Sequence, residues 1–288
     1  MRRGPCSARR VRAGARAFCG LLLLLACGRP EALDGRPIVA VSVLPLAYFV
    51  DGISGERVRV VVVLPPGASP TSYEPNMAQL AALAGAVLYV KVGHPDFPFE
   101  ATWLHAVLAA AGGPPVVDAS AGQQVVRGDP HVWLSLRHVR ALNQRLEAAL
   151  ALLMPEARAA FAANRRALDA EVDAVERELR ARLATQRGGR FVVLHPAWGY
   201  LAREYGLTQV AIEHDGKAPD AHALVQLIAH ARAEGVTTLF AQPHFDRASA
   251  DTIARELGAR VELLDPLAYD WPTNLREVAR ALSAGIVL

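Results

Sequence analysis

Short apolar runs alternate with longer helical patterns along this chain, and this alternation constrains the fold more than any other feature. Continuous apolar strands that alternate with helices are typical of a parallel sheet covered on both faces. The runs fall into two blocks, so we predict two lobes of about four strands each. The predicted strands are residues 38–44, 58–64, 86–92 and 116–117, then 191–194, 208–212, 237–241 and 260–264. The predicted helices are residues 45–53, 77–84, 99–111 and 136–153, then 197–205, 221–234, 248–257 and 274–284.

A single stretch without strand or glycine, residues 155–187, separates the two blocks. Its apolar residues recur every three or four positions, which places them on one face of a helix: Leu168, Val172, Val175, Leu179 and Leu183. Pro155 suits the first turn, and Gly188 and Gly189 suit the end. At 1.5 Å per residue the helix is roughly 46 Å long.

The predicted architecture is therefore α/β, with two (β/α)4 lobes that have parallel sheets. One long rigid helix joins the lobes, and a ligand cleft lies between them. We place the N-terminal lobe at residues 37–154, the connecting helix at 155–187 and the C-terminal lobe at 188–288.

The N-terminus carries the features of an export signal. Six arginines and no acidic residue precede the leucine run 21–25, which is too short to span a bilayer. Leu24-Leu25-Ala26-Cys27 resembles a lipobox, so we predict a signal peptide at residues 1–26, acylation of Cys27 and a tether at 27–36. Ordinary signal-peptidase cleavage near Ala26 is the alternative. The expected location is periplasmic or otherwise extracytoplasmic, with a lipid anchor in a membrane.

Export also changes the charge and the cysteine count. The whole chain has a formal charge of +3, and removal of six arginines with the signal leaves −3. Of the three cysteines only Cys27 would remain, so no disulfide framework is expected. The charge of the remaining chain gives no reason to expect a nucleic-acid partner.

Histidines and carboxylates follow several of the predicted strands. In open parallel sheets ligands bind at the carboxyl ends of the strands, and imidazole plus carboxylate is a common ligand set for zinc that also suits other divalent ions. Five of the nine histidines lie in these loops, and the other four lie in predicted helices, where we expect them at the surface. The loop set is His94, His131, His195, His214 and His244, with Glu74, Glu213 and Asp265, and the helical set is His105, His138, His222 and His230.

Several motifs occur in order over residues 37–285: Pro65-Pro66-Gly67-Ala68-Ser69-Pro70, then Asp129-Pro130-His131-Val132-Trp133, then His195, then Leu264-Asp265-Pro266-Leu267. Together they resemble the zinc/manganese cluster of substrate-binding lipoproteins of ABC importers. The resemblance implies a metal site formed by His131, His195 and Asp265. It also implies an ABC permease and its ATPase subunit as partners, and we expect a monomer.

One position departs from that family pattern. The family places a fourth ligand, a histidine, directly after Ser-Pro in the first motif, where this chain has Thr71. The substitute for this ligand stays open among water and five side chains: Glu74, His94, Glu213, His214 and His244.

Three classes of function follow from these observations. The first is a binding protein that captures a divalent transition-metal ion, zinc first and manganese second, and delivers it to a permease. The second is a binder of an organic or chelated-metal ligand, with Trp133, Trp198 and Tyr73 lining the cleft. The third is a metal-dependent hydrolase or oxidoreductase that uses two histidines and one aspartate. Since no candidate general base has a motif behind it, we expect a protein that is not an enzyme.

Overall fold

The structure is a computed structural model that describes residues 35–288 except 66, 69–72, 105–112, 214–219 and 244–246. These described residues belong to one compact unit. The predicted signal peptide, Cys27, Thr71, His105, His214 and His244 lie outside the described residues.

The N-terminal lobe is built on a four-stranded parallel sheet with the order β2-β1-β3-β4. Val41, the last residue of β1, pairs with Val62 of β2 and with Val90 of β3, so the carboxyl ends of neighbouring strands lie at one edge. Loops that follow these strands therefore start close together. The strands are β1 (Ile38–Val41), β2 (Arg59–Val62), β3 (Leu88–Lys91) and β4 (Val116–Asp118).

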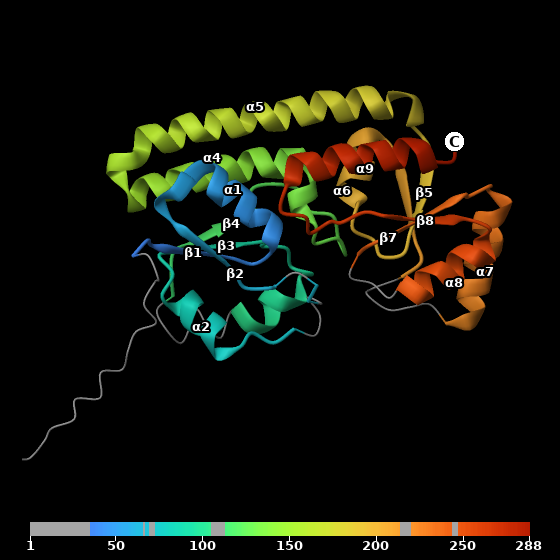
Figure 1. The fold of residues 1–288 in the computed structure, drawn as a ribbon, viewed down its shortest axis with the longest axis horizontal. Coiled ribbons are helices and arrows are strands. Elements are labelled where there is room, and N and C mark those ends of the chain that lie inside the picture. Colours follow the sequence, from blue (N-terminus) through green and yellow to red (C-terminus); the bar gives the residue numbers. More distant parts are fainter. Residues whose placement is uncertain (1–34, 66, 69–72, 105–112, 214–219, 244–246) are drawn as a thin grey trace, which may run out of the picture. The chain divides into compact units, whose positions relative to one another are not determined.

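The C-terminal lobe repeats this arrangement with the parallel order β6-β5-β7-β8 (Figure 1). Its register brings Val193 of β5 beside Ala211 of β6 and Phe240 of β7. The predicted class of two four-stranded parallel sheets is confirmed. The strands are β5 (Arg190–Val193), β6 (Thr208–Ala211), β7 (Thr238–Ala241) and β8 (Arg260–Leu263).

The long helix predicted between the blocks is also confirmed. Helix α5 (Arg158–Leu183) is preceded by a 3-10 turn, Pro155–Ala157, and followed by another, Ala184–Gln186. The residues of its apolar stripe are buried. The helix itself lies along α1, α4 and α9 (Figure 1). The other helices are α1 (Leu44–Ser54), α2 (Met77–Ala84), α4 (Leu136–Leu153), α6 (Gly199–Tyr205), α7 (Ala221–Ala233), α8 (Arg247–Leu257) and α9 (Trp271–Gly285).

Three details differ from the sequence-based expectation. The last helix begins at Trp271 rather than at 274, because the Asp270 side chain accepts a hydrogen bond from the Thr273 N–H and caps it. The described start of the predicted helix 99–111 is a π-helical turn, Glu100–Leu104. His138 was expected at the surface but is buried on α4, since it lies on the face that packs inward.

The hydrophobic core does not divide at the boundary between the lobes. One cluster runs from the N-terminal sheet past α5 to one face of β5, which contributes Phe191 and Val193. A second cluster lies on the other face of β5, with Val192 and, directly after the strand, Leu194, and it includes side chains of α7 and α8. Because strand side chains alternate between faces, one strand links both clusters.

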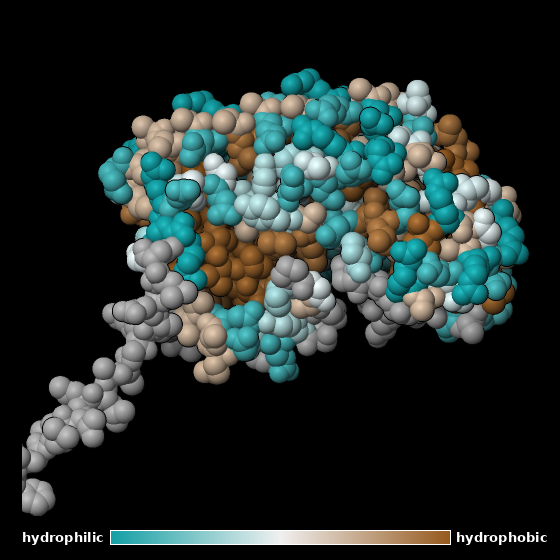
Figure 2. All heavy atoms as spheres, in the orientation of Figure 1, coloured by the Kyte–Doolittle hydropathy of each residue, from teal (hydrophilic) through white to brown (hydrophobic). Residues whose placement is uncertain are grey.

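The surface of the N-terminal lobe shows a hydrophobic area around edge strand β2, whose four residues are only partly buried (Figure 2).

In the part of the chain that the structure describes, every helix is too short or too polar to cross a bilayer.

Candidate metal centre

His131 is oriented by a carboxylate from its own loop. Its Nδ1 lies 2.7 Å from Asp129 Oδ1, and its backbone N–H donates to the same oxygen over 3.0 Å. Asp129 thus forms a tight local turn around the histidine. Both side chains are buried, so the bond is protected from competing water. A carboxylate on Nδ1 fixes the ring so that Nε2 is the nitrogen offered to a metal.

His195 has the same kind of partner, but from a different strand. It follows β5, and its Nδ1 lies 2.9 Å from Oε2 of Glu213, which follows β6. The Glu213 N–H donates to the Leu194 carbonyl over 2.9 Å and continues the pairing of β5 with β6. Parallel register therefore brings residues 195 and 213 together, as expected at the carboxyl edge of such a sheet.

The rings of the two histidines, one from each lobe, meet edge to face. Their ring centres are 5.7 Å apart, with the ring planes at 77°. Two imidazoles bound to one tetrahedral zinc, with Zn–N distances of about 2 Å, have ring centres roughly 5 Å apart. The observed pair is thus close to the geometry in which both rings can bind one ion.

The loop that carries His131 is held from both lobes. The Val126 carbonyl lies 2.9 Å from Nε2 of His94, and the Val126 N–H donates to the Tyr200 hydroxyl over 2.9 Å. Burial raises the pKa of Tyr200 to about 12, so this phenol stays protonated at neutral pH. His94 also accepts the Asp96 N–H at Nδ1. Both ring nitrogens of His94 are engaged by the backbone, which argues for a structural role rather than for the missing ligand.

Asp265 follows β8, as predicted, and its backbone and side chain are both held. Its Oδ1 accepts the Leu267 N–H over 2.8 Å, and its carbonyl accepts the Asn274 side-chain amide over 2.7 Å. Within the described ranges, no three histidine, cysteine or acidic side chains converge closely enough to hold an ion. The structure brings His131 and His195 together, and the membership of Asp265 in the ligand set stays a prediction.

Of the candidates for the missing ligand, Glu74 is exposed and Glu213 is hydrogen bonded to His195. Thr71, His214 and His244 lie outside the described residues. Sequence reasoning missed the orienting role of Asp129. Its position two residues before a loop histidine is the signal that could have revealed it, because an aspartate readily bonds the backbone two residues on.

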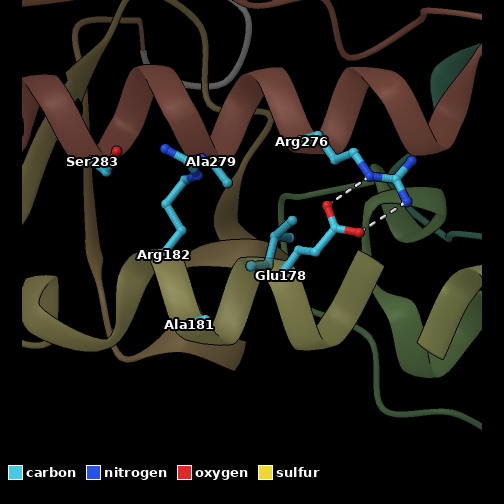
Figure 3. A pocket seen from close by; sticks show the side chains of 7 residues that line it. Glu178, Ala181, Arg182, Arg276, Ala279 and Ser283 are labelled. Atoms are coloured by element: carbon cyan, nitrogen blue, oxygen red, sulfur yellow. Dashed lines mark hydrogen bonds and ion pairs between the residues drawn. The ribbon is translucent and has the colours of Figure 1, made fainter. Parts of the chain in front are cut away.

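A cavity of about 580 Å³ lies elsewhere, between α5 and α9 (Figure 3). Arg276 and Glu178 form a two-bond ion pair on its wall, with nitrogen–oxygen distances of 2.8 and 3.2 Å. The predicted ligands are not among its lining residues, which are Glu178, Leu179, Ala181, Arg182, Arg276, Ala279 and Ser283.

Two parallel α/β lobes joined by a long helix, with a carboxylate-oriented histidine from each lobe, define a metal-binding transport receptor. Residues 39–285 match the family described as ZnuA, zinc-uptake complex component A, periplasmic. The chain belongs to this family. Members of this family are transport components rather than enzymes, and the family description names them periplasmic.

Known proteins agree in fold and in sequence. A crystal structure of ZnuA is 38% identical and superposes with a TM-score of 0.81 over 87% of this chain and 99% of that one. The high-affinity zinc uptake system protein ZnuA of Bacillus subtilis is 26% identical over 85% of each chain. The zinc-binding lipoprotein AdcA of Streptococcus pneumoniae (TIGR4) is 25% identical over 85% of this chain, which spans about half (53%) of AdcA.

Proposed function

We propose that this protein captures Zn²⁺ outside the cytoplasm and delivers it to an ABC permease driven by its ATPase subunit. The observation that supports this most directly is the facing pair His131 and His195, each with a carboxylate on Nδ1. Hydrogen bonding of this kind increases the basicity of a zinc-ligating imidazole and fixes its direction.

The proposed ligand set is His131, His195 and Asp265, completed by water or by a side chain from the segments outside the described residues. Two imidazoles and a carboxylate suit zinc, and manganese is the runner-up, because geometry and supply rather than ligand type select between such ions. Transport requires capture and release without chemical change, so we expect no catalytic turnover.

The alternative of an organic ligand has less support. It required Trp133, Trp198 and Tyr73 to line a cleft, but both indoles are fully buried in the core and Tyr73 is partly buried against it. Buried rings of this kind present no free face on which an organic ligand could stack.

The test of metal capture is the melting temperature of the metal-stripped protein, titrated with Zn²⁺, Mn²⁺ and Fe²⁺. An ion that binds only the native state stabilises it by about 4 kcal/mol at a thousandfold excess over its Kd. We expect a large saturable shift with Zn²⁺ and a smaller one with Mn²⁺. The absence of a shift with all three ions would refute the proposal.

The ligands are tested by His131→Ala and His195→Ala, each of which should weaken zinc binding at least tenfold. His230→Ala is the matched control, because His230 is exposed on α7 and pairs only with Glu234 in the described contacts. Unchanged affinity in either of the first two variants would remove that histidine from the site.

The membrane anchor is proposed from the sequence around Cys27, and the lipoprotein AdcA gives it indirect support. Cys27→Ser removes the thiol that would be acylated, so the variant should leave the membrane fraction. Fractionation of cells that express the full chain checks this, and a variant that still sediments with membranes would exclude acylation as the anchor.

A further inference from the structure

Two tryptophans connect the segment of His131 to the segment of Asp265 through reciprocal hydrogen bonds. The Trp133 indole N–H donates to the Pro266 carbonyl over 2.7 Å. The Trp271 indole N–H donates to the Trp133 carbonyl, also over 2.7 Å. Trp133 lies two residues after His131, and Pro266 directly follows Asp265. The pair therefore joins the loop of one predicted ligand to the loop of another, across the two lobes.

The surroundings of the two indoles keep these bonds in place. Trp133 and Trp271 are only 2% and 1% exposed. The Trp133 ring lies edge-on to the His131 ring at 5.2 Å, and the Trp271 ring packs against Phe49 of α1 at 5.4 Å. A buried indole N–H that loses its acceptor cannot turn to water, so each bond strongly favours one relative position of the two segments.

The Asp265 backbone is bonded from the other side as well. The Asn274 amide of α9 donates to the Asp265 carbonyl, while Trp133 holds the carbonyl of the next residue, Pro266. Two consecutive carbonyls are thus fixed, one by the C-terminal helix and one by the N-terminal lobe. The Asp265 side chain starts from a backbone with little freedom to shift.

We propose that Trp133 and Trp271 are positioning residues for the captured metal, because they fix the separation between His131 and Asp265. This proposal rests on the proposed function, since it concerns the same metal site. It predicts that the indole N–H groups matter for affinity and for coordination geometry, although neither indole binds the ion.

A simpler explanation is that every hydrogen bond between the lobes contributes equally to metal affinity. Tyr269 allows this to be tested, because its hydroxyl donates to Asp51 of α1 over 2.9 Å and also joins the lobes. Tyr269 is exposed at the surface, and its hydroxyl bonds Asp51 rather than the backbone at residues 133 or 266. Tyr269→Phe therefore removes a bond between the lobes without touching the tryptophan pair.

The experiment compares Trp133→Phe, Trp271→Phe and Tyr269→Phe in the full chain. Phenylalanine keeps a buried aromatic ring but removes the N–H donor together with part of the indole volume, so a double-mutant cycle with Asp265→Asn is needed to separate the lost bond from the lost packing. We would measure zinc affinity by competition with a chromophoric chelator, and the visible absorption of the Co²⁺-loaded protein, which reports the ligand geometry. We expect each tryptophan variant to bind zinc about tenfold more weakly, the lower end of what loss of a supporting hydrogen bond around a metal costs. We also expect an altered Co²⁺ spectrum in both.

Tyr269→Phe should match the parent in both measurements. The proposal is wrong if the tryptophan variants keep the parental zinc affinity and Co²⁺ spectrum. It is also wrong if Tyr269→Phe loses as much zinc affinity as the tryptophan variants. Where Trp133→Phe does not fold, Trp271→Phe alone decides, since it removes the other bond of the pair. A parent protein that binds neither ion refutes the proposed function itself, an outcome distinct from parental binding that survives the tryptophan substitutions.

A double-mutant cycle with Asp265→Asn adds a readout that simple destabilisation would not change. If Trp133 acts through Asp265, the double variant should lose clearly less zinc affinity than the product of the two single-variant fold-losses. Fully multiplicative losses would separate Trp133 from Asp265 and contradict the proposed coupling.

Discussion

The two histidines at the candidate centre have the same kind of partner but acquire it differently. The Nδ1 of His131 is hydrogen bonded to Oδ1 of Asp129, two residues earlier in the same loop, and the same oxygen accepts the His131 backbone N–H. His195 bonds Glu213, eighteen residues later, which reaches it only through the pairing of β5 with β6. The orientation of His131 is thus largely local, whereas that of His195 depends on the register of a sheet.

The Asp129–His131 pair is nevertheless also packed against the opposite lobe, through helix α6. A methyl group added at Gly199, in the first position of α6, would come within 2.5 Å of Asp129 Oδ2. The lack of a side chain at Gly199 lets α6 approach the Asp129 carboxylate. We therefore expect loss of the Asp129 carboxylate to weaken zinc binding more than loss of the charge on Glu213.

The largest effect should come from Asp129→Ala, which removes the partner of the ring and of the backbone at once. We expect zinc affinity to fall by about a hundredfold, the upper end for loss of such a supporting carboxylate. The melting temperature of the metal-free protein should fall as well, because a buried backbone bond is lost.

Asp96→Ala is the matched control for this variant. Asp96 accepts the Gly128 N–H and so supports the same loop without touching His131. If Asp96→Ala weakened zinc binding as much as Asp129→Ala, general loosening of the loop would explain both results.

Glu213→Gln should have a smaller effect, about tenfold in zinc affinity, since the amide oxygen can still accept from Nδ1 but carries no charge. The melting temperature of the metal-free protein should stay near that of the parent. Chelator competition and thermal melting check both points. A loss of affinity equal to that of Asp129→Ala would remove the difference between the two histidines.

Gly199→Ala should weaken zinc binding by about fivefold, because the new methyl group must displace the Asp129 carboxylate. In an Asp129→Ala background the same change should cost nothing further, since the clashing oxygen is gone. Isothermal titration of the single and double variants measures this. Equal additional losses in both backgrounds would show that Gly199 acts independently of Asp129.

The smallest effect on metal binding is expected at His138, a buried histidine whose two ring nitrogens have no hydrogen-bond partner in the described structure. Desolvation by burial, with a contribution from Arg145, lowers its pKa to about 4. The unfolded chain then binds more protons between pH 6.5 and 4, so the free energy of unfolding should fall as the pH drops through that range. His138→Phe should make this dependence shallower and leave zinc affinity at pH 7.5 unchanged. An unaltered slope of unfolding free energy against pH would contradict the assignment.

Much of this protein could be predicted from its sequence, because the decisive signals are local. Apolar runs of strand length, the stripe from Leu168 to Leu183 and the prolines and glycines around them specify the two lobes and the long helix. Because residues that follow parallel strands gather at one edge of a sheet, this pattern also pointed to five loop histidines, and the resemblance to the zinc/manganese family singled out His131 and His195 among them.

The contacts that give each of these side chains its role depend on tertiary structure. His94 and His131 are both loop histidines in the sequence, yet one bonds the backbone with both nitrogens and the other meets His195. His138 looked like a surface residue because a short helix segment does not reveal which neighbours will cover it. The bond from Glu213 to His195 and the bonds of Trp133 and Trp271 join residues 18 to 138 positions apart. Hydrogen bonds act over about 3 Å, so only the folded chain decides which of these groups come within that distance.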